Sequence, residues 1–392
     1  MPSRATIFAK PASAYYLILG ATTILAALGL VMVLSASSVA ALNETGNSFT
    51  IAIRQGLYLA LSVFLAWLAM NLRQVLWLPI ARLSLLIAVI LLLLPQIPGL
   101  GKSVGGNTNW IAIGAFSMQP SEFAKFLLII WCALRLREHD ARILHLGKSN
   151  PLPLVAPGVG LVLLLVLLGS DLGTASIIGG IVAGVLFISG MPLRYFATIA
   201  GVAAVGAGAL VLTNPNRIER FIAFSDPFSE NNYMGSGWQQ AHSIMGLASG
   251  GPLGSGLGSG KQKWGTLPEA HTDFIFAVIG EELGLLGTLA VLSLFAILII
   301  AIFRTALRTE NAFDRYVCAG VGCWISVQVV LNVGTVVSLM PVVGVTLPFI
   351  SYGGSSLMAT FIAIGYVLGV IRRDPAVIAE LRERRMMRSA RG

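Results

Sequence analysis

The amino-acid sequence predicts an all-α polytopic membrane protein, and three observations carry that prediction. Hydrophobic residues make up 56% of the 392 positions, the mean hydropathy is +0.83, and only 11% of the residues are charged. Apolar runs of about 20 residues recur along the whole chain, and each can cross about 30 Å of hydrocarbon as a helix. Helices satisfy their own backbone hydrogen bonds, so they are the structures expected within a bilayer.

Ten such runs predict about ten transmembrane helices. They cover approximately residues 15–38, 56–72, 77–98, 121–137, 152–169, 174–191, 194–213, 274–303, 316–338 and 355–371. The third run contains Pro79 and Arg82, which favours a helix that begins nearer residue 82. The eighth is long enough to include an interfacial turn. Together the runs form one membrane domain, residues 1–371, which ends in a short basic tail, residues 372–392.

The basic residues predict the orientation. Ten spans place both chain ends on one side, and with that side cytoplasmic, nineteen of the 26 lysines and arginines fall on inner segments. This asymmetry agrees with the positive-inside rule. It also explains the net charge of +9 without nucleic acid as a partner. The tail is expected to lie against anionic lipid headgroups, and the alternative is a docking site for a cytoplasmic partner.

The first concentration of polar residues on the outer side covers residues 101–125. Its glycines and amides predict a loop, and Trp110 suits the interface between membrane and water. Glu122 and Lys125 are three residues apart on one face of the following helix, so they can form an ion pair. Two interpretations stay open: a pair that fixes helix packing, or a Lys125 that faces a cavity and helps to hold an anionic headgroup.

The second is the large outer loop between spans 7 and 8, about residues 214–272. It contains a glycine-rich stretch, residues 250–260, that ends at Lys261 but lacks the spacing of a nucleotide-binding loop. We predict a mobile segment that closes over a substrate, with Lys261 and Lys263 available for phosphate groups. A connection of this length is usually functional or contains short helices of its own.

The end of this loop holds the densest charge in the chain. Residues 268–282 contain four carboxylates and one histidine. Asp273 lies where the polar loop becomes an apolar run, and a carboxylate at a membrane border is a candidate for function. Glu269 instead suits the start of a helix, where acids are favoured. Glu281 and Glu282 follow on the same predicted helix, and two interpretations stay open: a structural role, which includes pairing with basic groups across the bundle, or support of the residues that contact the substrate.

The third concentration, residues 339–356, interrupts apolar sequence with two prolines, three glycines and several hydroxyls, among them Ser351 and Ser355. Broken backbone at membrane depth is tolerated only where protein or a water-filled cavity satisfies its polar groups. The sequence therefore predicts a polar cavity that faces outwards. Asp171, in a tight outer turn, is expected to cap a helix.

In order and spacing, these segments resemble the SEDS family (shape, elongation, division and sporulation proteins), whose members include FtsW, RodA and SpoVE. The resemblance covers essentially the whole chain and rests on residues 109–111, 119–125, 171–174, 268–284 and 346–356. The stretch PEAHTDFIFAVIGEELG is long enough to be highly specific. One departure is Gly169–Ser170, where many members have Gln-Pro or Glu-Pro. Ala270 and the ISYGGSS sequence favour the division members.

The resemblance implies a ten-span peptidoglycan glycosyltransferase of the bacterial cytoplasmic (inner) membrane, with both termini in the cytoplasm. Such an enzyme polymerises lipid II outside that membrane. Its expected partners are a class B penicillin-binding protein and other membrane proteins of the division or elongation machinery. The essential aspartate of the family matches Asp273, and the tryptophan of its earlier outer loop matches Trp110.

That reaction needs one positioned base to take a proton from a sugar hydroxyl, and Asp273 is predicted to supply it. The pyrophosphate that leaves needs positive charge. Its predicted sources are Lys102, Arg217, Lys261, Lys263, or a divalent cation such as Mg²⁺ or Mn²⁺. The remaining residues predicted to contact the substrate are Glu122, Lys125, His271, Ser351 and Ser355. The cysteines and histidines show no metal-ligand spacing, and no other cofactor is implied.

Two further functions compete with the enzyme. A transporter could flip lipid II across the membrane, but it should carry polar residues along the full depth of its path, and here they gather on the outer side. A scaffold could recruit the crosslinking enzyme, but the outer polar cluster would then have no purpose.

Overall fold

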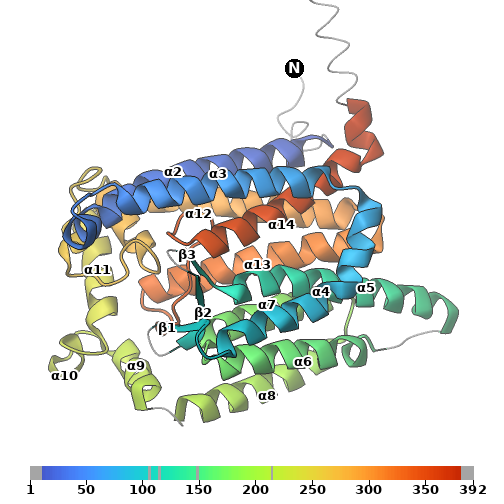
Figure 1. Cartoon of the computed structure of the whole chain (residues 1–392), viewed down its shortest axis with the longest axis horizontal. Coiled ribbons are helices and arrows are strands. Elements are labelled where there is room, and N and C mark those ends of the chain that lie inside the picture. Colours follow the sequence, from blue (N-terminus) through green and yellow to red (C-terminus); the bar gives the residue numbers. More distant parts are fainter. Residues whose placement is uncertain (1–10, 105–106, 114–115, 147–149, 213–214, 381–392) are drawn as a thin grey trace, which may run out of the picture.

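The computed structural model describes residues 11–104, 107–113, 116–146, 150–212 and 215–380. Within these residues there are ten long helices, which run side by side as one bundle (Figure 1). They are α2 (Ser13–Thr45), α3 (Thr50–Asn71), α4 (Gln74–Leu93), α5 (Pro120–Leu146), α6 (Leu152–Leu168), α7 (Leu172–Ile188), α8 (Leu193–Leu212), α12 (Ile275–Arg308), α13 (Ala312–Val336) and α14 (Gly354–Arg373). Each coincides with one predicted run, so the all-α membrane fold is confirmed.

Six of these segments are long and apolar enough to cross a membrane: α2, α3, Gln74–Gln96, α12, α13 and α14. α6, α7 and α8 contain shorter apolar stretches. The number of ten crossings therefore stays a prediction. The expectation that the third helix begins near residue 82 is wrong, because α4 begins at Gln74 and keeps Pro79 inside it.

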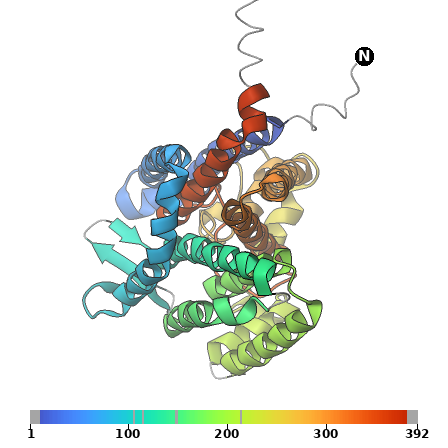
Figure 2. The ribbon, with the colours of Figure 1, turned by 90° about the vertical axis from the view of Figure 1, so that its right-hand side faces the viewer.

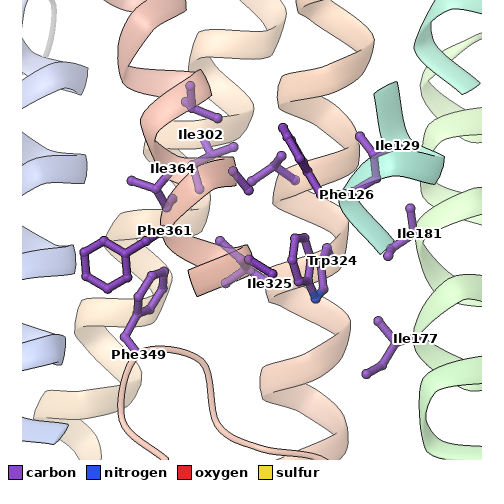
Figure 3. Close-up of a cluster of buried hydrophobic side chains, with 14 of the residues drawn as sticks. Phe126, Ile129, Ile177, Ile181, Ile302, Trp324, Ile325, Phe349, Phe361 and Ile364 are labelled. Carbon is purple, nitrogen blue, oxygen red and sulfur yellow. The ribbon is translucent and has the colours of Figure 1, made fainter. Parts of the chain in front are cut away.

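The core of the bundle forms around α13 and α14. Of the apolar window of α14, 83% is buried, against 17% for α3, so α3 turns most of its surface to the surroundings. Seen end-on in Figure 2, the darker orange α13 lies inside the bundle. Figure 3 shows its Trp324 and Ile325 among apolar side chains of α5, α7 and α14. These side chains are buried between helices and do not contact lipid. Close packing between them therefore holds the helices together.

One end of the bundle carries the segments that are predicted to lie outside the membrane (Figure 1). The large outer loop contains α9 (Pro215–Ser225), α10 (Glu230–Tyr233), α11 (Trp238–Gly250) and the short 3₁₀ helix η2 (Gln262–Trp264), which confirms that it has helices of its own. Within residues 101–118, predicted as a loop, the described residues instead form an antiparallel sheet in the order β1 (Gly101–Val104), β2 (Asn107–Ile113), β3 (Phe116–Met118). The signal for β2 is its run of threonine, tryptophan and isoleucine, which favour strands.

The two ends of the described chain meet at the opposite end of the bundle. The backbone N–H of Ala12 donates a hydrogen bond to Oε2 of Glu380, with 2.8 Å between nitrogen and oxygen. The prediction that both ends lie on one side is consistent with this contact, and that this side is the cytoplasm stays a prediction. Most of the predicted basic tail, residues 381–392, lies outside the described residues.

Candidate functional site

A cavity of about 340 Å³ lies at the end of the bundle that the sequence predicts to face outwards. All three polar concentrations contribute to its wall. It is lined by Asn109, Trp110, Gln119, Asp171, Gln239, Glu269, Thr272, Asp273, Val342, Val343, Gly344, Thr346, Tyr352, Gly353, Ser355 and Ser356. Of the predicted site residues, the structure thus brings together Asp273, Trp110 and Ser355.

Asp273 lies in a tight turn just before α12. The turn begins at Glu269, which has a left-handed φ of 56°. The carbonyl oxygen of Glu269 accepts from the N–H of Thr272 at 3.2 Å and of Phe274 at 3.1 Å. Its carboxylate accepts from the Thr272 hydroxyl at 2.6 Å. Glu269 therefore shapes the turn that presents Asp273, rather than capping α12, which has no side-chain cap.

Two side chains hold this turn from behind. Asn332 of α13 donates from Nδ2 to the carbonyl oxygens of Asp273 (2.8 Å) and Val345 (2.6 Å). The hydroxyl of Ser351 donates to the carbonyl of Thr272 at 2.6 Å. Residues 339–353, which lie between α13 and α14, are thereby joined to the turn. Asn332 was missed by the sequence analysis, because an asparagine within an apolar helix carries no spacing signal.

Ser351 and His271 were predicted to contact the substrate, but neither lines the cavity. Ser351 is buried and occupied with backbone partners. His271 is half-buried, its carbonyl accepts from the N–H of Tyr352 at 2.9 Å, and its ring centroid lies 5.6 Å from that of Tyr352. Burial lowers the pKa of His271, so the imidazole is neutral near pH 7.

The cavity is electrostatically negative in its described lining. Three carboxylates (Asp171, Glu269 and Asp273) line it, and no lysine or arginine does among the residues that the structure describes. Burial is the largest cause of a raised pKa at Asp273, and the charges of Glu269 and Asp171 add to it. Together they raise the pKa of Asp273 to about 7. A carboxylate with that pKa can take up a proton near neutral pH.

Asp171 caps α7, as predicted, and also fixes the cavity wall. Its Oδ1 accepts from the N–H of Thr174 at 2.9 Å. Its Oδ2 accepts from Nδ2 of Asn109 at 2.6 Å and from Nε2 of Gln119 at 3.1 Å. Because Asn109 precedes Trp110 on β2, these contacts hold the strand that presents the tryptophan. The sequence predicted the cap but not the contacts with Asn109 and Gln119, which are distant from Asp171 along the chain.

Glu122 and Lys125 form a buried ion pair, with 2.7 Å between Nζ and Oε1. Lys125 is 0% exposed, also donates to Oε1 of Gln328 at 3.2 Å, and lies 4.9 Å from the ring centroid of Trp324. Neither partner lines the cavity. This arrangement favours the helix-packing interpretation over a direct contact with a headgroup.

Three of the other predicted cations, Lys102, Lys261 and Lys263, lie outside the cavity lining. Lys102 is exposed on β1, directly opposite Trp110 in the register of the sheet. Lys261 is exposed, whereas Lys263 is buried and its Nζ lies 3.0 Å from Oε1 of Glu282. Arg217 is on α9, but its side chain lies outside what the structure describes. The prediction that Lys263 is available for phosphate is therefore wrong.

Within the described part of the chain, no three histidine, cysteine or acidic side chains lie close enough together to hold a metal ion. The divalent cation consequently stays a prediction. Cys132, Cys318 and Cys323 are free and buried.

Comparison with known proteins covers almost the whole chain. The family described as "Cell cycle protein", comprising FtsW, RodA and SpoVE, matches residues 15–374. The chain is 37% identical to stage V sporulation protein E of Bacillus subtilis, over 90% of this chain and 95% of that protein. It is also 37% identical to the probable peptidoglycan glycosyltransferase FtsW of Coxiella burnetii, over 89% of this chain and 94% of that protein.

Two solved structures share the fold. One, described as "Structural coordination of polymerization and crosslinking by a peptidoglycan synthase complex", matches with a TM-score of 0.74 and 28% identity. That match covers 91% of this chain and 98% of the other. The rod shape determining protein RodA of Thermus thermophilus matches with a TM-score of 0.62 and 29% identity, over 91% of this chain and 96% of that one.

Proposed function

The chain belongs to the FtsW, RodA and SpoVE family, and on that premise we propose that it is a peptidoglycan glycosyltransferase. It polymerises lipid II into glycan strands at the outer face of the bacterial cytoplasmic membrane, for cell division or cell-shape maintenance. The single observation that carries the proposal is Asp273, which combines a pKa of about 7 with a place in an outward cavity that it shares with Trp110.

In the proposed reaction, the 4-hydroxyl oxygen of the acceptor sugar attacks the anomeric carbon of the donor. The new carbon–oxygen bond forms as the bond from that carbon to the pyrophosphate oxygen breaks, and undecaprenyl pyrophosphate leaves with the electron pair. Asp273 takes the hydroxyl proton. Such a base contributes about 10²–10⁴-fold. The leaving group is already activated, so the second carboxylic acid of ordinary glycoside hydrolysis is not required.

The leaving pyrophosphate carries negative charge, and basic residues near the cavity neutralise it. Residues directly opposite on paired strands share one face of a sheet, so Lys102 is placed on the same face as Trp110, which lines the cavity. Lys102 is therefore the first source of positive charge that we propose, followed by Lys261, Arg217 and a divalent cation such as Mg²⁺ or Mn²⁺.

A second, apolar cavity of about 350 Å³ supports a lipid-linked substrate. Its lining contains Trp77, Ile80, Leu91, Met118, Phe123, Phe126, Leu127, Ile130, Ala359 and Ile362. Met118 adjoins Gln119, and Ala359 lies one turn beyond Ser355, so neighbouring residues of the same segments line the two cavities. The sugar and pyrophosphate would occupy the polar cavity, with the first prenyl units in the apolar one.

The partner that we propose is a class B penicillin-binding protein, which crosslinks the strands that this chain makes. The support is the similarity to a chain of a peptidoglycan synthase complex. Other membrane proteins of the division or elongation machinery are expected in the same assembly.

The testing experiment uses purified protein and lipid II in detergent, with and without a class B penicillin-binding protein. Glycan strands are measured by gel electrophoresis of labelled product. We expect strands of many disaccharide units. The same protein in vesicles tests the competing transporter function. If lipid II moves across the bilayer and no polymer forms, the protein is a flippase and not a glycosyltransferase.

We expect the polymerisation rate to rise with pH through a midpoint near 7, because Asp273 acts only when ionised. Below the midpoint the rate should fall about tenfold per pH unit. A carboxylate with the ordinary pKa of about 4 would leave the rate flat above pH 5. The measurement is the initial rate from pH 5 to 9 with lipid II well below its KM, because that rate reports the pKa of the free protein. A flat profile over that range would contradict the raised pKa of Asp273.

For Trp110→Ala we expect about a tenfold lower kcat/KM for lipid II, because the ring supplies a large apolar contact surface at the cavity wall. The melting temperature should stay within a few degrees. The matched control is Trp264→Ala, since Trp264 is 69% exposed on the outer loop. Equal kinetics for both variants would reduce Trp110 to an interface residue.

A further inference from the structure

α12 is divided into two parts at Gly284. This residue has φ 68° and ψ −167° inside an otherwise continuous helix, a combination that only glycine adopts readily. A Cβ at this position would lie 2.3 Å from the backbone nitrogen of Gly254. The part before the break, residues 275–283, is called the front segment below.

The break is filled by the backbone of another part of the chain, residues 250–263, called the glycine loop below. The N–H groups of Ser255 and Gly256 donate to the carbonyls of Glu281 (2.9 Å) and Glu282 (3.0 Å). On the other side, Leu285 and Leu286 donate to the carbonyls of Gly251 (2.9 Å) and Pro252 (3.2 Å). These four bonds satisfy groups that the helix itself leaves unpaired.

Two buried acids then hold the glycine loop in place. Glu281 accepts from the backbone N–H of Lys261 at 2.7 Å and of Gln262 at 3.2 Å. Glu282 is 1% exposed and forms an ion pair with Lys263. The hydroxyl of Ser35, on α2, donates to both Glu282 oxygens, at 2.7 and 2.8 Å. Backbone and side chains of the glycine loop are thus both engaged in this conformation. That the loop is mobile and closes over a substrate stays a prediction.

This network lies at the far end of the segment that carries the proposed base. Asp273 is two residues before Ile275, where α12 begins, and every residue of the front segment except Leu283 is buried. From residue 273 to 282 the helical rise is about 13.5 Å, too far for direct contact between the side chains. Influence on Asp273 must therefore pass through the position of the front segment as a unit.

We propose that the ion pair between Lys263 and Glu282, with Ser35, positions Asp273 by locking the front segment against α2 and the glycine loop. The inference rests on the proposed function, because it takes Asp273 as the base. Removing the lock lets the front segment shift, and a misplacement of about 1 Å at a reacting group costs up to about 10²-fold in rate.

The test uses two variants that leave the net charge unchanged, so that electrostatics do not imitate a shift. One is the pair variant Lys263→Met with Glu282→Gln, and the other is the milder Ser35→Ala. We expect kcat to fall about 10–100-fold in the pair variant and several-fold in Ser35→Ala, with KM within about threefold of wild type. The matched control Glu219→Gln changes an exposed acid of the same outer loop and should keep the wild-type rate.

The pH profile separates positioning from a merely structural role. The titratable groups around Asp273 are Glu269, His271, Asp171 and Tyr352, and all remain in both variants. A displaced Asp273 is better hydrated, so its pKa falls and the midpoint of the rate should move to lower pH. Loss of stability alone would lower the amount of folded protein and leave that midpoint where it is.

The outcomes distinguish this inference from the function on which it rests. A wild-type protein that makes no strands, or a fully active Asp273→Ala variant, overturns the base assignment and the inference with it. The inference alone is overturned by a different set of results. In that set the wild type is active and Asp273→Ala is inactive, while Ser35→Ala keeps the wild-type kcat per folded molecule and the wild-type pH midpoint. Ser35→Ala decides the question even where the pair variant does not fold, because it removes one hydroxyl and no charge.

Discussion

The Asp273→Ala variant is expected to make essentially no glycan strands from lipid II. The alanine removes the group that accepts the hydroxyl proton, so the rate should fall about 10²–10⁴-fold. Its folding should be retained, because a carboxylate whose pKa is raised by burial is costly to the folded state when ionised. The melting temperature at pH 8 should therefore be unchanged or higher, and binding to the penicillin-binding protein should persist.

The matched control is Asp226→Ala, which removes an exposed aspartate from the same outer loop. It should polymerise at the wild-type rate. Asp273→Asn keeps the shape of the side chain but not its basicity, and it should be as inactive as the alanine variant. Near wild-type rates in both Asp273 variants would falsify the general-base assignment.

The second large effect concerns stability. Lys125→Met should lower the free energy of unfolding by about 3–5 kcal/mol, because it leaves the Glu122 carboxylate buried without its cation. The side chains of this pair are 0% and 8% exposed, so little solvent is available to replace the lost partner. The measurement is unfolding in mixed micelles, followed by tryptophan fluorescence.

The same helix supplies the control. Arg135 and Glu138 form an ion pair of the same spacing on α5, but their side chains are 41% and 40% exposed. Arg135→Met should therefore cost less than about 1 kcal/mol. If Lys125→Met and Arg135→Met destabilise the protein equally, burial of the Glu122–Lys125 pair does not matter for stability.

The helices could be predicted from the sequence because their signal is local. A run of apolar residues predicts a span regardless of its neighbours, and the ten long helices follow the predicted runs within a few residues at most ends. The candidate base could also be found, because Asp273 lies at a visible boundary between polar and apolar sequence. The resemblance to the family added the role of Trp110, which composition alone does not indicate.

What the sequence could not predict depends on partners far away along the chain. Lys263 was predicted to be available for phosphate groups because a sequence shows a charge but not its partners. In the structure those partners are Glu282 and Ser35, and Ser35 is 228 positions away. Asn332 and Asp171 likewise act on backbone or side chains more than 50 positions away. The short sheet was missed because its glycines and amides outweighed the strand-forming residues of β2.

The contact between Ala12 and Glu380 also limits how the chain can cross the bilayer. Atoms 2.8 Å apart cannot lie on opposite sides of about 30 Å of hydrocarbon. The number of crossings must therefore be even. If one of the shorter apolar helices α6, α7 or α8 proves to be re-entrant, a second helix must also fail to cross. Ten crossings would then become eight, never nine, and fluorophores attached at Ala12 and at Glu380 would still report the same compartment.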